Sequence, residues 1–181
     1  MKYLFVGILC VAFVSCRIAN KHHEVIFPDN LEYTSKSGTN KDTLLTILQG
    51  ASYKIITRID GDCPKCHPQL ELWDQYIKEI REKEIPVSFY VIIPVTNKLV
   101  FEYTTEKYQY DYFFFLDGDN KFWKYNFELL KNTEETFLTN IENEILYVGN
   151  PTLDVKEKLK YYEIFETEKI VNQLNNKSIN N

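Results

Sequence analysis

The chain has 181 residues, of which 44% are hydrophobic and 26% are charged, and it contains only six Gly and six Pro. This composition excludes collagen-like, low-complexity and largely disordered proteins, and the length is sufficient for one domain with its own hydrophobic core. A formal net charge of −5 argues against a nucleic-acid-binding protein, which would normally carry a basic excess. Four cysteines are too few for a disulfide-stabilised scaffold of this size.

The N-terminus has the features of an export signal. Lys2 precedes an apolar run over residues 4–14, which is too short to span a bilayer as a permanent helix. The run ends at Ser15 and Cys16, which resembles the lipobox of bacterial lipoproteins. This resemblance implies that the signal peptide 1–15 is removed, and that acylated Cys16 holds the protein in the bilayer on the extracytoplasmic side of the bacterial cell envelope, in the periplasm. A plain cleaved signal and an uncleaved anchor are the alternatives.

The next segments predict a tether, a helix and a strand. Residues 16–40 are polar with few periodic apolar residues, and we expect a tether that leads into a short strand or loop. Three leucines between 44 and 48, closed by Gly50, predict a short helix over 41–49. The β-branched residues of 53–59 predict a strand.

The middle of the chain has the pattern of a βαβ unit. From Gln69 onwards apolar residues recur at helical spacing. The run 87–93 between two prolines is apolar and β-branched, which predicts a buried strand. A right-handed crossover makes this strand parallel to strand 53–59.

The last third of the chain predicts alternating helices and strands, ending in a helix. We expect a helix over 97–107, a strand over 112–116, a turn at 117–120, a helical segment over 121–130, strands over 136–139 and 144–148, and a helix from 154 to at least 165. The Asp-Gly-Asp turns at 60–62 and 117–119 reflect shared turn chemistry rather than a repeat. The Asn-rich end, 172–181, predicts a flexible tail.

Cys63 and Cys66 form a Cys-x-x-Cys motif between the predicted strand 53–59 and the helix that starts near Gln69. Two intervening residues bring both sulfurs to the first turn of that helix, close enough for a disulfide. The helix N-terminus offers unpaired N–H groups and a partial positive charge, which stabilise the attacking thiolate. Pro64 suits the first helical position. We expect Cys63 to attack a substrate and Cys66 to resolve the mixed disulfide.

The element order and this motif together resemble the thioredoxin fold, as used by membrane-tethered thiol-disulfide oxidoreductases of the TlpA/ResA kind. Those proteins carry an extra helix–strand pair after the first βαβ unit, which matches residues 97–116. The resemblance implies an α/β, thioredoxin-like domain over 41–171, with a central mixed sheet, helices on both faces and an inserted helix–strand pair. It also implies disulfide exchange with exported proteins, a membrane redox partner that resets the dithiol, and no cofactor or metal.

Charged residues beside the motif are candidates for tuning the cysteine pKa. Lys65 and His67 add positive charge, whereas Asp60 and Asp62 act in the opposite direction, so the sequence does not rank the redox potential.

The stretch before strand 136–139 departs from the family pattern. Thioredoxin-like enzymes generally have a cis-proline there, facing the cysteine pair, but this sequence has Glu134 or Glu135 at about that place. A carboxylate beside Cys63 would oppose the thiolate and would alter the backbone edge that docks substrate.

Other functions fit the motif less well. The missing proline motivates a non-catalytic thioredoxin-like envelope lipoprotein that binds a partner, with a static disulfide. Cys-x-x-Cys followed by His67 is also the signature of c-type haem attachment. There His67 would be the proximal ligand. However, Met1 is the only methionine, so the second axial ligand would have to be His22 or His23, or the iron would stay five-coordinate. Structural zinc needs four ligands, and the sequence offers too few nearby.

Overall fold

The computed structural model describes residues 24–28, 31–34, 51–105, 113–131 and 135–179. Its strands are β1 (Glu32–Thr34), β2 (Tyr53–Arg58), β3 (Val87–Ile93), β4 (Phe113–Leu116), β5 (Thr136–Asn140) and β6 (Ile145–Val148). Its helices are α2 (Pro68–Glu82), α3 (Lys98–Thr105), α4 (Lys121–Tyr125), α5 (Phe127–Leu130) and α6 (Val155–Ile179). No helix within these segments is both long enough and apolar enough to cross a membrane.

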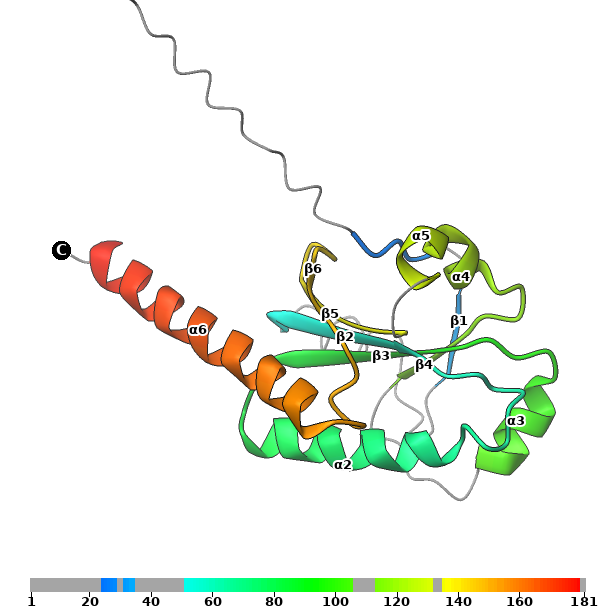
Figure 1. Ribbon diagram of the computed structural model, residues 1–181. Helices are drawn as coiled ribbons and strands as arrows, with labels where there is room; N and C mark the ends of the chain where they lie inside the picture. The colour runs from blue at the N-terminus through cyan, green and yellow to red at the C-terminus, as the bar shows by residue number, and fades with distance from the viewer. Residues whose placement is uncertain (1–23, 29–30, 35–50, 106–112, 132–134, 180–181) are drawn as a thin grey trace, which may run out of the picture.

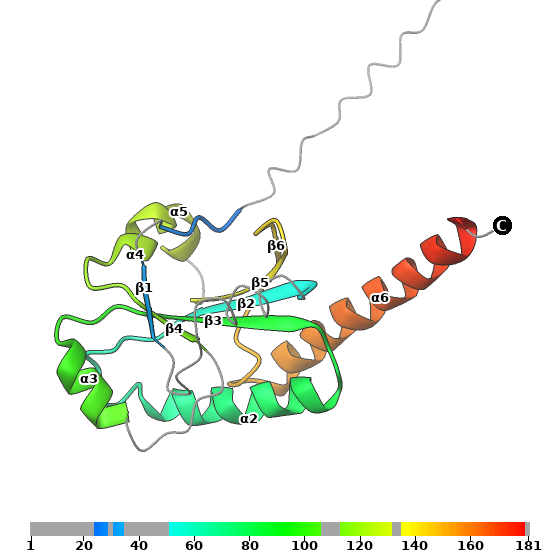
Figure 2. The ribbon, with the colours of Figure 1, turned by 180° about the vertical axis from the view of Figure 1, so that it is seen from behind.

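The strands form one mixed sheet in the order β1-β4-β3-β2-β5-β6. Strands β2, β3 and β4 are mutually parallel, as the predicted crossover requires, whereas β1, β5 and β6 each pair antiparallel with a neighbour. Helices α2, α3 and α6 lie on one side of the sheet, and α4 and α5 lie on the other (Figures 1 and 2). The predicted α/β fold, with its mixed sheet, two helical layers and inserted helix–strand pair, α3 and β4, is therefore confirmed.

Two hydrophobic clusters fill the two faces of the sheet. Because side chains alternate along a strand, neighbouring residues of β2 enter different clusters: Ile55 packs with α2, and Ile56 packs with α4. The larger cluster includes Trp73 of α2 and Tyr161 of α6, both fully buried. This packing holds α2, which follows the cysteine motif, firmly against the sheet.

Residues 24–28 and 31–34, in the region where we expected a tether leading into a short strand or loop, pack against the sheet. Strand β1 pairs with β4, Glu24 forms a bridge with Glu144, and Val25 is fully buried against the sheet. The amide of Ile26 donates to the side chain of Asn126 at 2.8 Å. These described residues therefore contact the sheet and the α4–α5 region directly.

Three predicted helices have different bounds, and one is not described. The helical segment 121–130 is divided at Asn126, whose backbone leaves the helical conformation (φ −108°, ψ 20°) and whose side chain forms hydrogen bonds with the backbone of Ile26. Helix α6 continues to Ile179, through most of the segment expected to be a flexible tail. Helix α2 begins at Pro68, after the cysteine motif. The predicted helix 41–49 lies outside the described residues.

Candidate redox site

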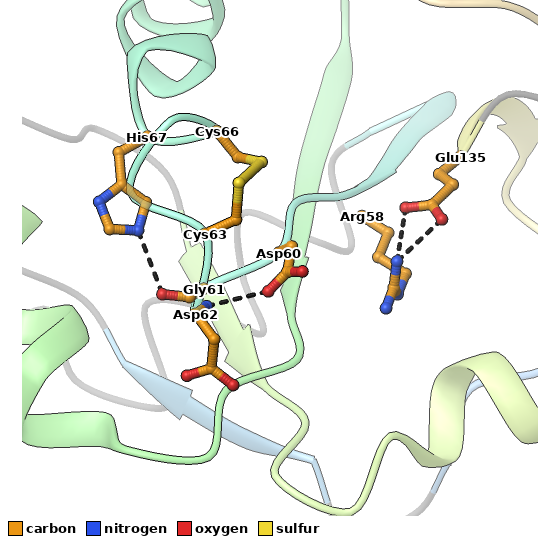
Figure 3. The surroundings of a disulfide bond; sticks show 8 residues. All are labelled: Arg58, Asp60, Gly61, Asp62, Cys63, Cys66, His67 and Glu135. Atoms are coloured by element: carbon orange, nitrogen blue, oxygen red, sulfur yellow. Dashed lines mark hydrogen bonds and ion pairs between the residues drawn. A yellow bond between two sulfur atoms is a disulfide. The ribbon is translucent and has the colours of Figure 1, made fainter.

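Cys63 and Cys66 are joined by a disulfide in the turn between β2 and α2, with their Cα atoms 5.3 Å apart. Both residues are half-buried, and Cys66 packs against the larger hydrophobic cluster. Figure 3 shows the two sulfurs on one side of the turn and the His67 ring on the other. The site residues named from the sequence are thus gathered around one turn, with the exceptions described below.

The cysteines lie just before α2 rather than in its first turn. The amide of Cys66 donates to the carbonyl of Cys63 at 2.8 Å, and the amide of Gln69 donates to Cys66 at 3.0 Å, so the motif forms successive i, i+3 turns. Pro68 occupies the first helical position that we assigned to Pro64. Because Pro68 has no N–H, it cannot make the i to i−4 bond that would extend the α-helix back through the motif. The partial positive charge of the helix N-terminus still lies next to the cysteines.

The Asp-Gly-Asp turn ties the motif to the end of β3. The amide of Gly61 donates to the carbonyl of Pro94 at 2.9 Å, and the Asp60 carboxylate accepts from the amide of Asp62, also at 2.9 Å. The Asp62 carboxylate accepts from the amide and the hydroxyl of Thr96, each at 2.9 Å. Asp60 and Asp62, which we expected to oppose the Cys63 thiolate by their charge, therefore also fix the backbone before Cys63.

His67 is only 5% exposed and packs behind the motif. Its Nε2 lies 3.1 Å from the carbonyl oxygen of Gly61, which makes Nε2 the protonated nitrogen of that hydrogen bond. Its ring meets Phe101 of α3 edge-on, with centroids 5.7 Å apart. His67 thus connects the end of the cysteine motif to the Asp-Gly-Asp turn and to α3. Lys65, in contrast, is exposed to solvent. Whether either residue tunes the cysteines stays a prediction.

The carboxylate of Glu135, just before β5, forms an ion pair with Arg58. Arg58 at the end of β2 donates to both of its oxygens, at 2.8 and 2.7 Å. The Arg58 guanidinium also lies over the ring of Trp123, 5.3 Å from its centroid. Glu134 and the lipid-attachment candidate Cys16 lie outside the described residues, and the described part of the chain contains no cis peptide bond.

Sequence reasoning did not find Arg58, Trp123 or Thr96. Arg58 could have been suspected only as a charge at the end of a β-branched-rich strand, and Thr96 carries no signal of its own. No group of three His, Cys, Asp or Glu residues within the described segments could hold a metal ion.

No protein-family model matches the sequence, and no curated protein matches it either. Solved structures are similar in fold. A Chlorobium tepidum protein assigned as the thiol:disulfide interchange protein DsbE has a TM-score of 0.53 and 14% identity, over 80% of this chain and 96% of that one. Thioredoxin from Wuchereria bancrofti has a TM-score of 0.50 and 10% identity, over 65% of this chain and 81% of that one. Yeast Sco1 with copper bound has a TM-score of 0.50 and 15% identity, over 65% and 78%.

These neighbours and the sheet order define the class: the chain is an α/β protein with a thioredoxin-like fold. Its Cys-x-x-Cys pair lies between the first strand and the helix of a parallel βαβ unit, as the family resemblance implied.

Proposed function

We propose that this protein is a thiol-disulfide oxidoreductase that exchanges disulfides with exported proteins at the extracytoplasmic face of the bacterial envelope. The observation that carries the proposal is the half-buried Cys63–Cys66 disulfide, placed before α2 in a thioredoxin-like fold. Acylated Cys16 anchors the protein in the lipid bilayer, and a membrane partner resets its dithiol. The composition of the N-terminal segment supports the export and anchoring steps.

The two cysteines have different surroundings, which suggests different roles. Cys66 packs against the hydrophobic cluster under α2, so Cys63 is the sulfur that a partner protein reaches first. The partial positive charge of the helix N-terminus stabilises a thiolate there. Cys63 is therefore the attacking residue, and Cys66 is the resolving residue.

In the reducing direction the exchange has two steps. The Cys63 thiolate attacks one sulfur of the substrate disulfide; that S–S bond breaks, a mixed disulfide forms, and the leaving substrate thiolate takes a proton from solvent. The Cys66 thiolate then attacks the Cys63 sulfur, forms the disulfide seen in the structure, and releases the second substrate thiol. The substrate gains two electrons, which an external dithiol must restore to the protein. The oxidising direction is the reverse of these steps.

The test is disulfide exchange with an oxidised peptide substrate, comparing the wild-type chain with Cys63→Ser and Cys66→Ser. We expect the wild type to accelerate exchange and Cys63→Ser to show only the background rate. Cys66→Ser keeps the attacking thiol and should accumulate a mixed disulfide, which also identifies partners when the trap is run in the native host. Equal background rates in the wild type and Cys63→Ser would refute the proposed disulfide-exchange activity.

A non-catalytic, partner-binding protein is the second candidate, and the Glu135–Arg58 pair favours it. Glu135 is one of the two glutamates that stand at about the place where the resemblance implies a substrate-docking cis-proline. A Cys63 pKa near the free-thiol value of about 8.5, without exchange activity, would support this candidate. A pKa well below 7 would count against it.

The lipid anchor is tested separately by metabolic labelling with a fatty acid. We expect Cys16→Ser to lose the label and Cys10→Ser to keep it.

A further inference from the structure

Two side chains from distant parts of the chain, Glu135 and Trp123, contact the guanidinium of Arg58, the last residue of β2. Glu135 accepts two hydrogen bonds from Arg58 Nη1, and its backbone carbonyl accepts from the Arg58 amide at 2.9 Å. The ring of Trp123 in α4 covers the guanidinium. The Arg58 side chain is only 15% exposed. A cation held this closely is not an ordinary solvated surface charge.

The geometry of this cation depends on partners from distant parts of the chain. Trp123 is held in place because α4 is anchored by the buried Asp117, whose carboxylate accepts from the amides of Lys121 and Phe122 at 2.7 and 2.8 Å. The Nε atom of Arg58 is buried, and no described residue accepts a hydrogen bond from it. A partly desolvated guanidinium needs a counter-charge, which Glu135 supplies.

The pair and the disulfide lie at the same edge of the sheet, because Arg58 ends β2, Glu135 precedes the paired start of β5, and the cysteine turn follows β2. Figure 3 shows both sulfurs on the side of the turn that faces Arg58 and Glu135. Only Ile59 and the Asp-Gly-Asp turn separate Arg58 from Cys63 along the chain. A reduced Cys63 thiolate would therefore lie in the electric field of both members of the pair.

We propose that Arg58 is a positioning residue for the charge at this site: it compensates Glu135, so that the Cys63 thiolate meets a neutralised pair instead of a lone carboxylate. The inference rests on the proposed thiol-disulfide function and names the electrostatic element of that site. Trp123 holds the guanidinium against Glu135. Among the described residues, the turn that carries Cys63 also contributes the titratable groups Asp60, Asp62, Lys65 and His67.

Because a nearby positive charge stabilises a thiolate and a negative charge destabilises it, the two members act in opposite directions. Glu135→Gln leaves Arg58 uncompensated and should lower the pKa of Cys63 by about half a unit, on the scale of charges interacting near a protein surface. Arg58→Gln leaves Glu135 uncompensated and should raise it by a similar amount. The double variant should return close to the wild type. Half a unit is about a threefold change in thiolate fraction below the pKa.

The experiment is the pH dependence of Cys63 alkylation in the reduced full-length chain carrying Cys66→Ser, with the wild type, the two single variants and the double variant. Glu142→Gln is the matched control, because it removes the same charge from the turn at the opposite end of β5. Arg58→Lys keeps the charge but loses the fork and the ring stacking, and should leave the Cys63 pKa within about 0.2 of the wild type. If Arg58→Gln does not fold, Glu135→Gln and Arg58→Lys still decide the question.

Opposite shifts in the single variants, cancelling in the double variant, support the proposal. Unchanged pKa values, shifts of the same sign, or an equal shift in Glu142→Gln overturn it and leave Arg58 with a purely structural role. The readout needs no turnover, so it is separate from the exchange assay. Opposite shifts without exchange would reject the proposed function alone, whereas exchange without shifts would reject this inference alone.

Discussion

Adding a single methyl group at Gly61 should destabilise the turn that carries the cysteines. A Cβ there would lie 2.6 Å from Ile93 Cγ2 and 3.0 Å from both the carbonyl oxygen of Pro94 and Val95 Cβ. Ile93 is fully buried, and the Gly61 amide is hydrogen-bonded to that same carbonyl, so neither side can withdraw freely. Overpacking of this kind costs typically 1–3 kcal/mol, and we expect Gly61→Ala to lose about 2 kcal/mol.

The second Asp-Gly-Asp turn provides a matched control. A Cβ on Gly118 would meet only the carbonyl oxygen of Val95, at an ordinary contact distance of 3.5 Å. Gly118→Ala should therefore change the free energy of unfolding by less than about 0.5 kcal/mol.

Urea and thermal unfolding of the oxidised proteins would measure both variants. Gly61→Ala should lower the Tm by about 4–8 °C for a domain of this size. Equal stability of Gly61→Ala and the wild type would refute the steric argument, and so would an equal loss in both glycine variants.

Three further predictions concern buried or paired ionisable groups. Asp117→Ala should cost about 2 kcal/mol in urea unfolding, because it removes the buried carboxylate that accepts two amides at the start of α4; an unchanged midpoint would contradict this. The hydrogen bond from Lys158 to Glu79, aided by that from Tyr162, holds the pKa of Glu79 below its usual value despite burial. Its stabilising effect is present above the unfolded pKa of about 4.3 and is lost as the pH falls through the folded pKa, so the stability difference between the wild type and Glu79→Gln should shrink there. Burial raises the pKa of Tyr90 to about 12. The stability gained from keeping the buried phenol neutral should therefore be complete below pH 10 and lost between about pH 10 and 12, and Tyr90→Phe should flatten that part of an alkaline unfolding series. Ionisation of Tyr90 near the ordinary tyrosine pKa of about 10, detected by phenolate absorbance, would contradict this.

The sequence predicted the regular core of the fold because that core is encoded locally. Strands β2 and β3 are rich in β-branched residues, and helix α2 places its apolar residues on one face, so short windows of sequence were sufficient. The docking of residues 24–28 and 31–34 could not be predicted in this way. It depends on contacts between distant parts of the chain, such as the hydrogen bonds between Ile26 and Asn126, which are 100 residues apart, and Asn126 is also where the helical segment 121–130 is divided.

The site was predictable to the same degree. The Cys-x-x-Cys motif is local and indicated both the turn and its chemistry. The apolar periodicity indicated the start of α2 to within one residue, but the first helical position was assigned to Pro64, four residues early, because two prolines compete for it and only Pro68 lies after the i, i+3 turns. The pairing of Arg58 with Glu135 spans 77 residues, and no local pattern indicates it.

The two Asp-Gly-Asp turns share a sequence and a location but not a role. They follow β2 and β4, the parallel strands on either side of β3, and therefore lie at the same carboxyl edge of the sheet, where both approach Val95. In the first turn Asp62 reaches across to Thr96, and in the second turn Asp117 anchors α4. Open α/β sheets concentrate their chemistry at this edge, because loops from neighbouring strands meet there. In this protein one turn fixes the backbone before Cys63, and the other fixes the helix whose Trp123 covers Arg58. Rigid turns at one edge thus hold both the sulfurs and the charges that we expect to act on them.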